Sequence, residues 1–198
     1  MDFLHRAIGR PSRLGVFPGS FNPVTVAHLA LARAALQHVD EVVFVLPRLF
    51  PHKNYRGATF EQRLELLRRA TAGESAFAVA ASDGGLFLEI ARECREAYHP
   101  DIQLSFLCGR DAAERIVGWD YGRPDAAGDM LRQFTLLVAA RNGSYEPPQE
   151  HAHAVRPIQV EGCDAISATE VRERIARGEA WEHLVPESIH RTVARIYR

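Results

Sequence analysis

The sequence predicts an α/β fold, in which a parallel sheet is flanked by helices and followed by a helical C-terminal segment. Short apolar runs alternate with segments of helical periodicity, as expected for parallel strands joined by crossover helices. The chain has 198 residues, of which 46% are hydrophobic, so it can bury a sizeable core. We therefore predict a single Rossmann-like domain over residues 1–198. The predicted strands are Leu14–Phe17, Glu41–Pro47, Ala76–Ala81, Ile102–Cys108, Phe134–Ala140 and a short one near Val155–Val160.

Helices are predicted between these strands from periodicity and from their start signals. An Ala- and Leu-rich stretch after Pro23 predicts a helix to about Val39. Thr59 followed by Gln62 is a capping-box pattern, which marks the start of the next helix. Helical patterning also covers Leu86–Tyr98 and Pro124–Arg132. The segment from Asn142 to His153, rich in Gly, Ser, Pro and His, predicts an exposed loop.

The C-terminal segment, residues 166–198, is predicted to be helical. Ser167 followed by Glu170 is a second capping-box pattern, and Gly178 is a typical helix end. A last helix is expected from about Pro186. We expect these helices to cover one end of the sheet and to bring Arg172 back toward the first loop.

Composition limits the class of protein. The formal net charge is −1, so nothing indicates broad binding to nucleic acid or to an anionic membrane surface. Cys94, Cys108 and Cys163 are odd in number and form no Cys-x-x-Cys pair, which favours reduced, mostly buried thiols. No signal-peptide core or membrane-spanning run is present, so we expect a soluble cytoplasmic protein. The sequence leaves the oligomeric state open.

A phosphate site is predicted where the first of these strands ends. Pro18, Gly19 and Pro23 form a loop that leads into a helix, and the free N–H groups at a helix start attract anions. Gly19 and Ser20 are small enough for a ligand to approach the backbone. Thr25 and His28 lie one helical turn apart, so both side chains are expected to donate to phosphate oxygens.

Ligands of open α/β sheets bind beyond the carboxyl ends of the strands. The segments that follow three of the predicted strands at that edge are Pro18–His28, Leu49–Arg56 and Gly109–Trp119. Because one topology brings these segments together, we expect a single site at this edge.

Two motifs resemble the nucleotidyltransferase superfamily. Gly19-Ser20-Phe21-Asn22-Pro23 followed by Thr25-Val26-Ala27-His28 resembles its Gly-(Ser/Thr)-Phe-(Asp/Asn)-Pro and (His/Thr)-x-Gly-His signature, with Ala27 in place of Gly. Ile166-Ser167-Ala168-Thr169-Glu170-Val171-Arg172 resembles its second motif. The units Pro51-His52-Lys53 and Gly109-Arg110-Asp111, with Trp119 downstream, resemble the nicotinate mononucleotide adenylyltransferases within it.

This resemblance implies adenylyl transfer from ATP, with Mg²⁺, to nicotinate mononucleotide in NAD biosynthesis, without a protein nucleophile. It implies catalytic roles for Thr25, His28, Lys53 and Arg172. The implied ATP-binding residues are Gly19, Ser20, Phe21, His28, Gly109, Asp111, Ile166, Ser167, Thr169 and Arg172. The implied acceptor-binding residues are Asn22, His52, Lys53 and Trp119. Residues 166–198 would close the ATP site.

Three departures from the family pattern leave alternatives open. Gly84–Leu88 lies where the family has a Tyr-Thr stretch, Arg110 replaces a small residue, and Ala27 replaces Gly. Another acceptor, such as phosphopantetheine, would preserve the chemistry, and a nucleotide-binding regulator would have lost it. No protein-bound metal is predicted, because His151 and His153 stand in a polar loop without Cys or acidic companions.

Overall fold

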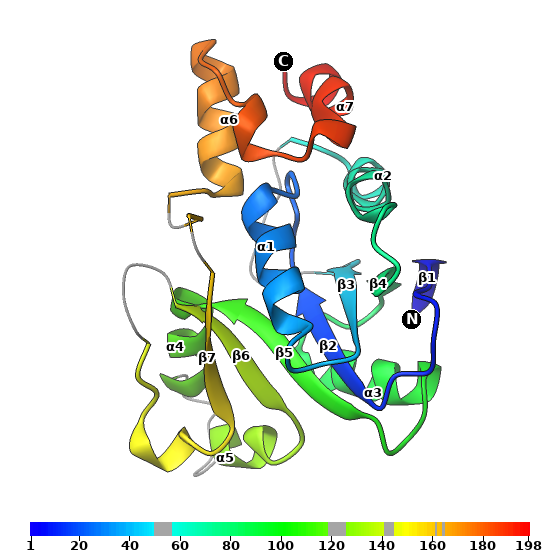
Figure 1. Cartoon of the computed structure of the whole chain (residues 1–198), viewed down its shortest axis with the longest axis vertical. Coiled ribbons are helices and arrows are strands. Elements are labelled where there is room, and N and C mark those ends of the chain that lie inside the picture. Colours follow the sequence, from blue (N-terminus) through cyan, green and yellow to red (C-terminus); the bar gives the residue numbers. More distant parts are fainter. Residues whose placement is uncertain (50–56, 119–125, 141–144, 161, 164) are drawn as a thin grey trace.

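A seven-stranded sheet forms the centre of the molecule (Figure 1). The computed structural model describes residues 1–49, 57–118, 126–140, 145–160, 162–163 and 165–198. The spatial order of the strands is β1-β4-β3-β2-β5-β6-β7, in which β1 is antiparallel to β4 and the other pairs are parallel. The strands are β1 (Asp2–His5), β2 (Arg13–Pro18), β3 (Glu41–Pro47), β4 (Phe77–Ser82), β5 (Gln103–Gly109), β6 (Thr135–Ala140) and β7 (Val155–Gln159).

The strand order reverses between β2 and β5. From β2 the chain proceeds outward through β3 to β4, and it then returns to the other side of β2 to build β5, β6 and β7. Such a reversal opens a crevice at the carboxyl ends of the two central strands. The predicted Rossmann-like parallel sheet is confirmed, and the crevice lies where the sequence places its anion site.

Helices cover both faces of the sheet, and each face has its own hydrophobic cluster. Residues of α1, α2, α6 and α7 pack in one cluster, and residues of α3, α4 and α5 pack in the other. In β3, Phe44 and Leu46 belong to the first cluster and Val43 and Val45 to the second, because successive side chains of a strand point to opposite faces. The helices are α1 (Val26–Ala35), α2 (Phe60–Thr71), α3 (Phe87–Ala97), α4 (Arg110–Gly118), α5 (Ala126–Leu131), α6 (Ala168–Arg177) and α7 (His190–Tyr197).

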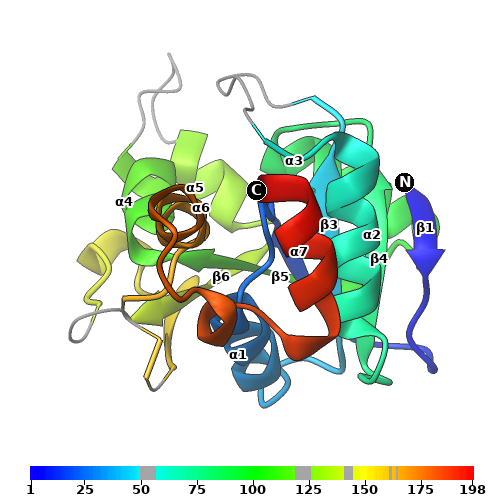
Figure 2. The same cartoon turned by 90° about the horizontal axis from the view of Figure 1, so that it is seen from above.

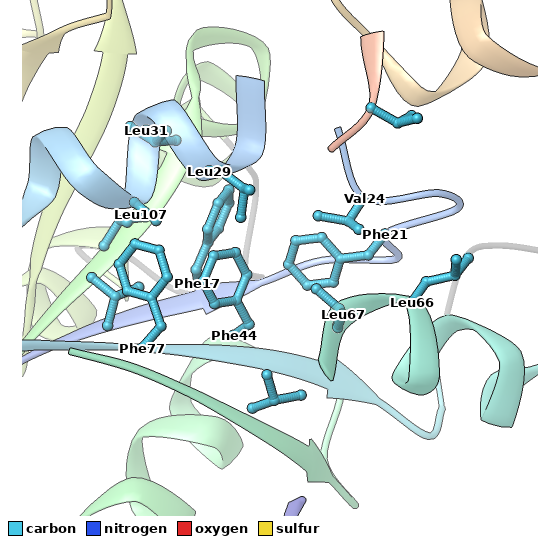
Figure 3. Close-up of a cluster of buried hydrophobic side chains, with 14 of the residues drawn as sticks. Phe17, Phe21, Val24, Leu29, Leu31, Phe44, Leu66, Leu67, Phe77 and Leu107 are labelled. Atoms are coloured by element: carbon cyan, nitrogen blue, oxygen red, sulfur yellow. The ribbon is translucent and has the colours of Figure 1, made fainter. Parts of the chain in front are cut away.

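The first cluster contains a row of aromatic rings beneath the predicted site (Figure 3). The ring of Phe44 lies 5.4 Å from that of Phe17, 5.6 Å from that of Phe21 and 5.4 Å from that of Phe77, between centroids. Phe21 lies within the loop that follows β2 and is only 1% exposed. The loop is therefore anchored in the core by its own aromatic side chain.

The C-terminal segment packs on this same cluster. Val171 and Ile175 of α6 and Val193 of α7 are buried with residues of α1 and α2. Helix α6 ends at Gly178, whose φ of 70° is left-handed and whose N–H donates to the carbonyls of Arg174 and Ile175. In the view from above, α7 lies beside α2 (Figure 2). The predicted helical segment at residues 166–198 is confirmed.

Two elements differ from the sequence predictions. Strand β1 is not predicted, since it has only four residues and pairs at the edge of the sheet with β4. The loop predicted over Asn142–His153 is not uniformly exposed: in its described part, Tyr145 and His151 are 5% and 8% exposed, and Gln149–His151 forms a 3₁₀ turn. Tyr145 is buried because it packs against the second cluster, which local composition does not reveal.

Within the described part of the chain, no helix is long and apolar enough to span a bilayer.

Candidate active site

The loop after β2 has a tightly packed backbone. The N–H of Gly19 donates to the carbonyl of Val45 on the neighbouring strand at 3.0 Å. A Cβ atom at Gly19 would lie 2.8 Å from the tip of the Phe21 ring, closer than carbon atoms can pack. Phe21 itself has a φ of 43° and is buried. Its side chain is therefore part of the core, and only its backbone is available for the predicted contact with ATP.

Helix α1 begins with a capping box made by Thr25 and His28. The Thr25 N–H donates to Nδ1 of His28 at 3.0 Å, and the His28 N–H donates to Thr25 Oγ1 at 3.4 Å. Thr25 Oγ1 also lies 2.7 Å from Nδ1. A main-chain N–H can only donate, so Nδ1 is the acceptor and the ring proton of the neutral imidazole resides on Nε2.

This arrangement changes the role of Thr25. Its side chain is completely buried, and its hydroxyl donates to Nδ1 because that nitrogen carries no proton. Thr25 thus orients His28 instead of facing a ligand, which differs from the prediction that both side chains donate to phosphate. The rings of Phe17 and Phe21, centred 5.8 and 5.2 Å from the imidazole, hold its position further.

His28 lines a cavity of about 110 Å³ at the carboxyl ends of the central strands. Gly109, at the end of β5, also lines this cavity, and a Cβ atom at Gly109 would meet no other atom within 4 Å. Ala139 of β6 and Cys163 also contribute to the lining. Ordinary ligand pockets measure about 300–1,000 Å³. This cavity is smaller, so it can hold only part of a nucleotide.

Arg172 of the second motif reaches the first motif. Its Nη1 donates to the carbonyl of Asn22 at 2.5 Å and to that of Ala168 at 3.0 Å, and its Nη2 donates to Thr169 Oγ1 at 3.2 Å. Ser167 caps the same helix, since its Oγ accepts from the N–H of Glu170 at 3.0 Å. In the predicted capping box, the Glu170 side chain would also accept from the Ser167 N–H. The Glu170 carboxylate instead forms an ion pair with Arg174. The two motifs are therefore in direct contact.

Two residues that the sequence reasoning missed also hold this loop. Arg63 of α2 is 5% exposed, and its Nη1 donates to the carbonyl of Ser20 at 3.0 Å. Tyr197 of α7 donates its hydroxyl to Oδ1 of Asn22 at 2.5 Å. Arg63 stands at helical spacing from Leu66 and Leu67 on the apolar face of α2, and a cation in such a place is a signal that could have been noticed.

Comparison with known proteins decides the family. The model of the cytidylyltransferase-like family matches residues 16–174, which is most of the chain. A protein of Gloeobacter violaceus, named probable nicotinate-nucleotide adenylyltransferase, is 34% identical over 194 residues, covering 89% of this chain and 91% of the relative. The chain belongs to the nicotinate-nucleotide adenylyltransferases of the cytidylyltransferase-like family. A second relative of the same name, from Clavibacter michiganensis, is 32% identical to this nucleotidyltransferase, with 94% of each chain covered.

Solved structures agree with this family's fold. The nicotinic acid mononucleotide adenylyltransferase of Plasmodium falciparum in complex with NaAD superposes with a TM-score of 0.71 and 17% identity, covering 92% of this chain and 95% of that one. The same protein complexed with APC gives a TM-score of 0.68 at 16% identity, covering 92% and 94%. The resemblance drawn from the motifs is confirmed.

The remaining predicted residues of this nucleotidyltransferase have four different outcomes. Gly109 lies with His28 at the cavity, as expected. Asp111 does not line it: this carboxylate is exposed in the first turn of α4 and borders a separate open depression with Glu114 and Arg115. Ile166 packs partly against the first hydrophobic cluster. His52, Lys53 and Trp119 lie outside the described residues.

The departures from the family pattern have structural explanations in two cases. Arg110 is exposed, and its Nε pairs with Glu114 at 2.8 Å, so its charge is balanced on the surface of α4. The methyl group of Ala27 is 4% exposed and forms part of the cavity lining. In the third departure, the segment Gly84–Leu88, the side chains of Leu86 and Leu88 are 53% and 42% exposed.

All three cysteines are free, and burial raises the pKa of the Cys94 and Cys108 thiols to about 12.

Proposed function

We propose that this chain transfers the AMP group of ATP to nicotinate mononucleotide, giving a dinucleotide and pyrophosphate in NAD biosynthesis. A phosphate oxygen of the mononucleotide attacks the α-phosphorus of ATP and forms the new P–O bond. The bond from that phosphorus to the oxygen bridging the β-phosphate breaks, and its electron pair leaves with pyrophosphate. No protein nucleophile takes part. The reaction needs two anions held in line and charge stabilised during transfer.

The contact of Arg172 with the backbone of Asn22 is the observation that carries this proposal. It joins two motifs 150 residues apart at the end of the sheet where a nucleotide is expected. The guanidinium offers a planar set of donors suited to phosphate. His28 adds an N–H donor at Nε2, because Nδ1 is held as an acceptor by Thr25. A donor aimed at developing negative charge is the group that adenylyl transfer requires.

Magnesium is proposed to enter with ATP as part of the substrate. Among the described residues, no three His, Cys, Asp or Glu side chains gather into a metal-binding group. The ion would therefore be held by the triphosphate oxygens. We expect turnover to stop in excess chelator and to return when Mg²⁺ is restored.

The test is pyrophosphate release by the purified protein with ATP, Mg²⁺ and a panel of acceptors. Nicotinate mononucleotide should be used best, with nicotinamide mononucleotide and phosphopantetheine as competing acceptors. Preference for another acceptor would keep the chemistry and replace the substrate. Tight ATP binding by calorimetry without product from any acceptor would identify a nucleotide-binding regulator and refute the proposal.

A further inference from the structure

The last turn of the final helix contacts the first motif through a single phenol. Tyr197 is half-buried at the end of α7, and its hydroxyl donates to Oδ1 of Asn22 at 2.5 Å. Burial raises the pKa of this phenol above its ordinary value, although the nearby Arg172 and Arg63 act in the opposite direction. The hydroxyl is therefore protonated at neutral pH and serves as a permanent donor to the Asn22 amide.

Gly57 completes this contact. A Cβ atom at Gly57 would lie 3.2 Å from Cε1 of Tyr197, 3.4 Å from Oδ1 of Asn22 and 3.6 Å from its Nδ2. Gly57 also has a φ of 111°, which residues with side chains rarely adopt. The backbone at Gly57 thus packs directly on the phenol ring and on the side-chain amide. Asn22, Gly57 and Tyr197 form one contact from three distant parts of the chain.

The Asn22 side chain and the His28 cavity have different neighbours. The cavity is lined from β5 and β6 through Gly109 and Ala139. The Asn22 contact is formed on the side of β3 and α2, where Arg63 holds the adjoining carbonyl of Ser20. Figure 2 shows α7 beside α2, on the side of β3. A two-substrate reaction at a sheet reversal offers one half-site to each substrate. Arg172, which we assign to ATP, donates to the main-chain carbonyl of Asn22. The side-chain amide of Asn22 contacts Tyr197 and does not line the His28 cavity, so we assign this amide to the acceptor.

We propose that Tyr197 is a positioning residue for the acceptor mononucleotide and acts through the side chain of Asn22. Because the Tyr197 hydroxyl donates to Oδ1 of Asn22, this contact fixes the orientation of the Asn22 side-chain amide. The amide N–H₂ group is thereby held in one orientation beside the acceptor half-site. This inference rests on the proposed function, because it needs an acceptor to position.

Tyr197→Phe is the test, since it removes one oxygen and keeps the ring that packs on Gly57. We expect the KM for nicotinate mononucleotide to rise about 3- to 10-fold, the range that loss of one hydrogen bond gives. The KM for ATP and kcat should stay within about two-fold. Tyr98→Phe is the matched control: Tyr98 also donates its hydroxyl to a buried side chain, that of Glu41, but at the first residue of β3 and so at the far end of the sheet. It should leave both KM values unchanged.

A double-mutant cycle shows whether Tyr197 acts through Asn22. On the Asn22→Ala background, Tyr197→Phe should change the acceptor KM by less than about two-fold, because the hydrogen bond is already gone. Equal rises in both KM values, an unchanged acceptor KM, or full additivity with Asn22→Ala would overturn the inference while leaving the proposed function intact. A wild-type protein without turnover on any acceptor would overturn both. Circular dichroism and urea unfolding of each variant identify any loss of fold.

Discussion

The main-chain N–H of Thr25 donates to Nδ1 of His28 across the first turn of α1 at 3.0 Å. One hydrogen bond therefore does two things. It satisfies an N–H at the start of the helix, and it sets the protonated ring nitrogen at Nε2. The helix cap and the proposed catalytic donor are the same side chain, so removal of His28 has a structural effect and a chemical effect that must be separated.

His28→Ala should lower kcat about 10²- to 10³-fold, as loss of a preorganised donor to developing charge does elsewhere. The matched control is Gln62→Ala, because Gln62 caps α2 in the same way and its Oε1 accepts from the Thr59 N–H at 2.8 Å. Both variants should lose a similar free energy of unfolding, about 0.5–1 kcal/mol, measured in urea. A kcat for His28→Ala within three-fold of wild type would show that the imidazole is only a cap.

Arg172→Lys should raise the KM for ATP about tenfold or more, since hydrogen bonds to charged groups contribute about 1.5–3 kcal/mol and Lys loses the planar pair of donors. Arg174→Lys serves as the control on the same helix, because Arg174 pairs with Glu170. Initial rates over a range of ATP concentrations distinguish the two. Equal kinetics for both variants would place the phosphates away from α6.

Gly19→Ala should destabilise the protein and impair turnover. The added methyl group would meet the Phe21 ring at 2.8 Å, and overpacking of a tight core costs about 1–3 kcal/mol. For a chain of this size, each kcal/mol corresponds to a Tm decrease of about 2–4 °C. Gly73→Ala is the control, since a Cβ atom there would meet nothing within 4 Å. Equal Tm values for Gly19→Ala and Gly73→Ala would mean that the loop after β2 rearranges to accommodate the added methyl group at little cost in stability.

The contribution of Glu93 to stability should depend on pH. Burial disfavours the charged form of this carboxylate, yet hydrogen bonds from the Gly84 N–H at 2.9 Å and Ser82 Oγ at 2.7 Å keep its pKa below the ordinary value. A lowered pKa in the folded state contributes stability above the unfolded pKa of about 4.3, and this contribution is lost as the pH falls.

We therefore expect Glu93→Gln to lower the free energy of unfolding by about 1–3 kcal/mol at pH 7, with a smaller difference from wild type below about pH 4. The exposed Glu96, substituted in the same way, should show little effect at either pH. Urea unfolding at the two pH values measures both. A difference for Glu93→Gln that stays constant with pH would contradict the assignment.

The sequence was sufficient to predict elements whose signals are local. β3, with all of Glu41–Pro47 buried, and the capping box of Thr59 with Gln62 follow from short stretches of chain. Strand β1 could not be predicted, because its four residues become a strand only by pairing with β4 about 75 residues later. The burial of Tyr145 likewise depends on packing against the second cluster.

In the site, too, features with a local sequence signal were predicted and features that depend on tertiary contacts were not. The placement of His28 and Gly109 followed from motif and topology. The burial of the Thr25 hydroxyl behind His28 did not, since it depends on the rotamer that the capping box selects. Arg63 and Tyr197 contact Ser20 and Asn22 across the fold. The apolar face of α2 marks Arg63 as unusual, but a single sequence does not reveal which distant residue either side chain contacts.

The contacts on Asn22 have a consequence for the growing chain. Arg172 and Tyr197 follow Asn22 by 150 and 175 residues. At a synthesis rate of about 5–20 residues per second, roughly 10–35 s separate translation of the first motif from that of Tyr197. Until then the loop after β2 lacks two of its hydrogen-bond partners. A nascent chain on the ribosome would thus have its sheet before it has a finished active site, and the acceptor half-site would be complete only after α7 has left the exit tunnel.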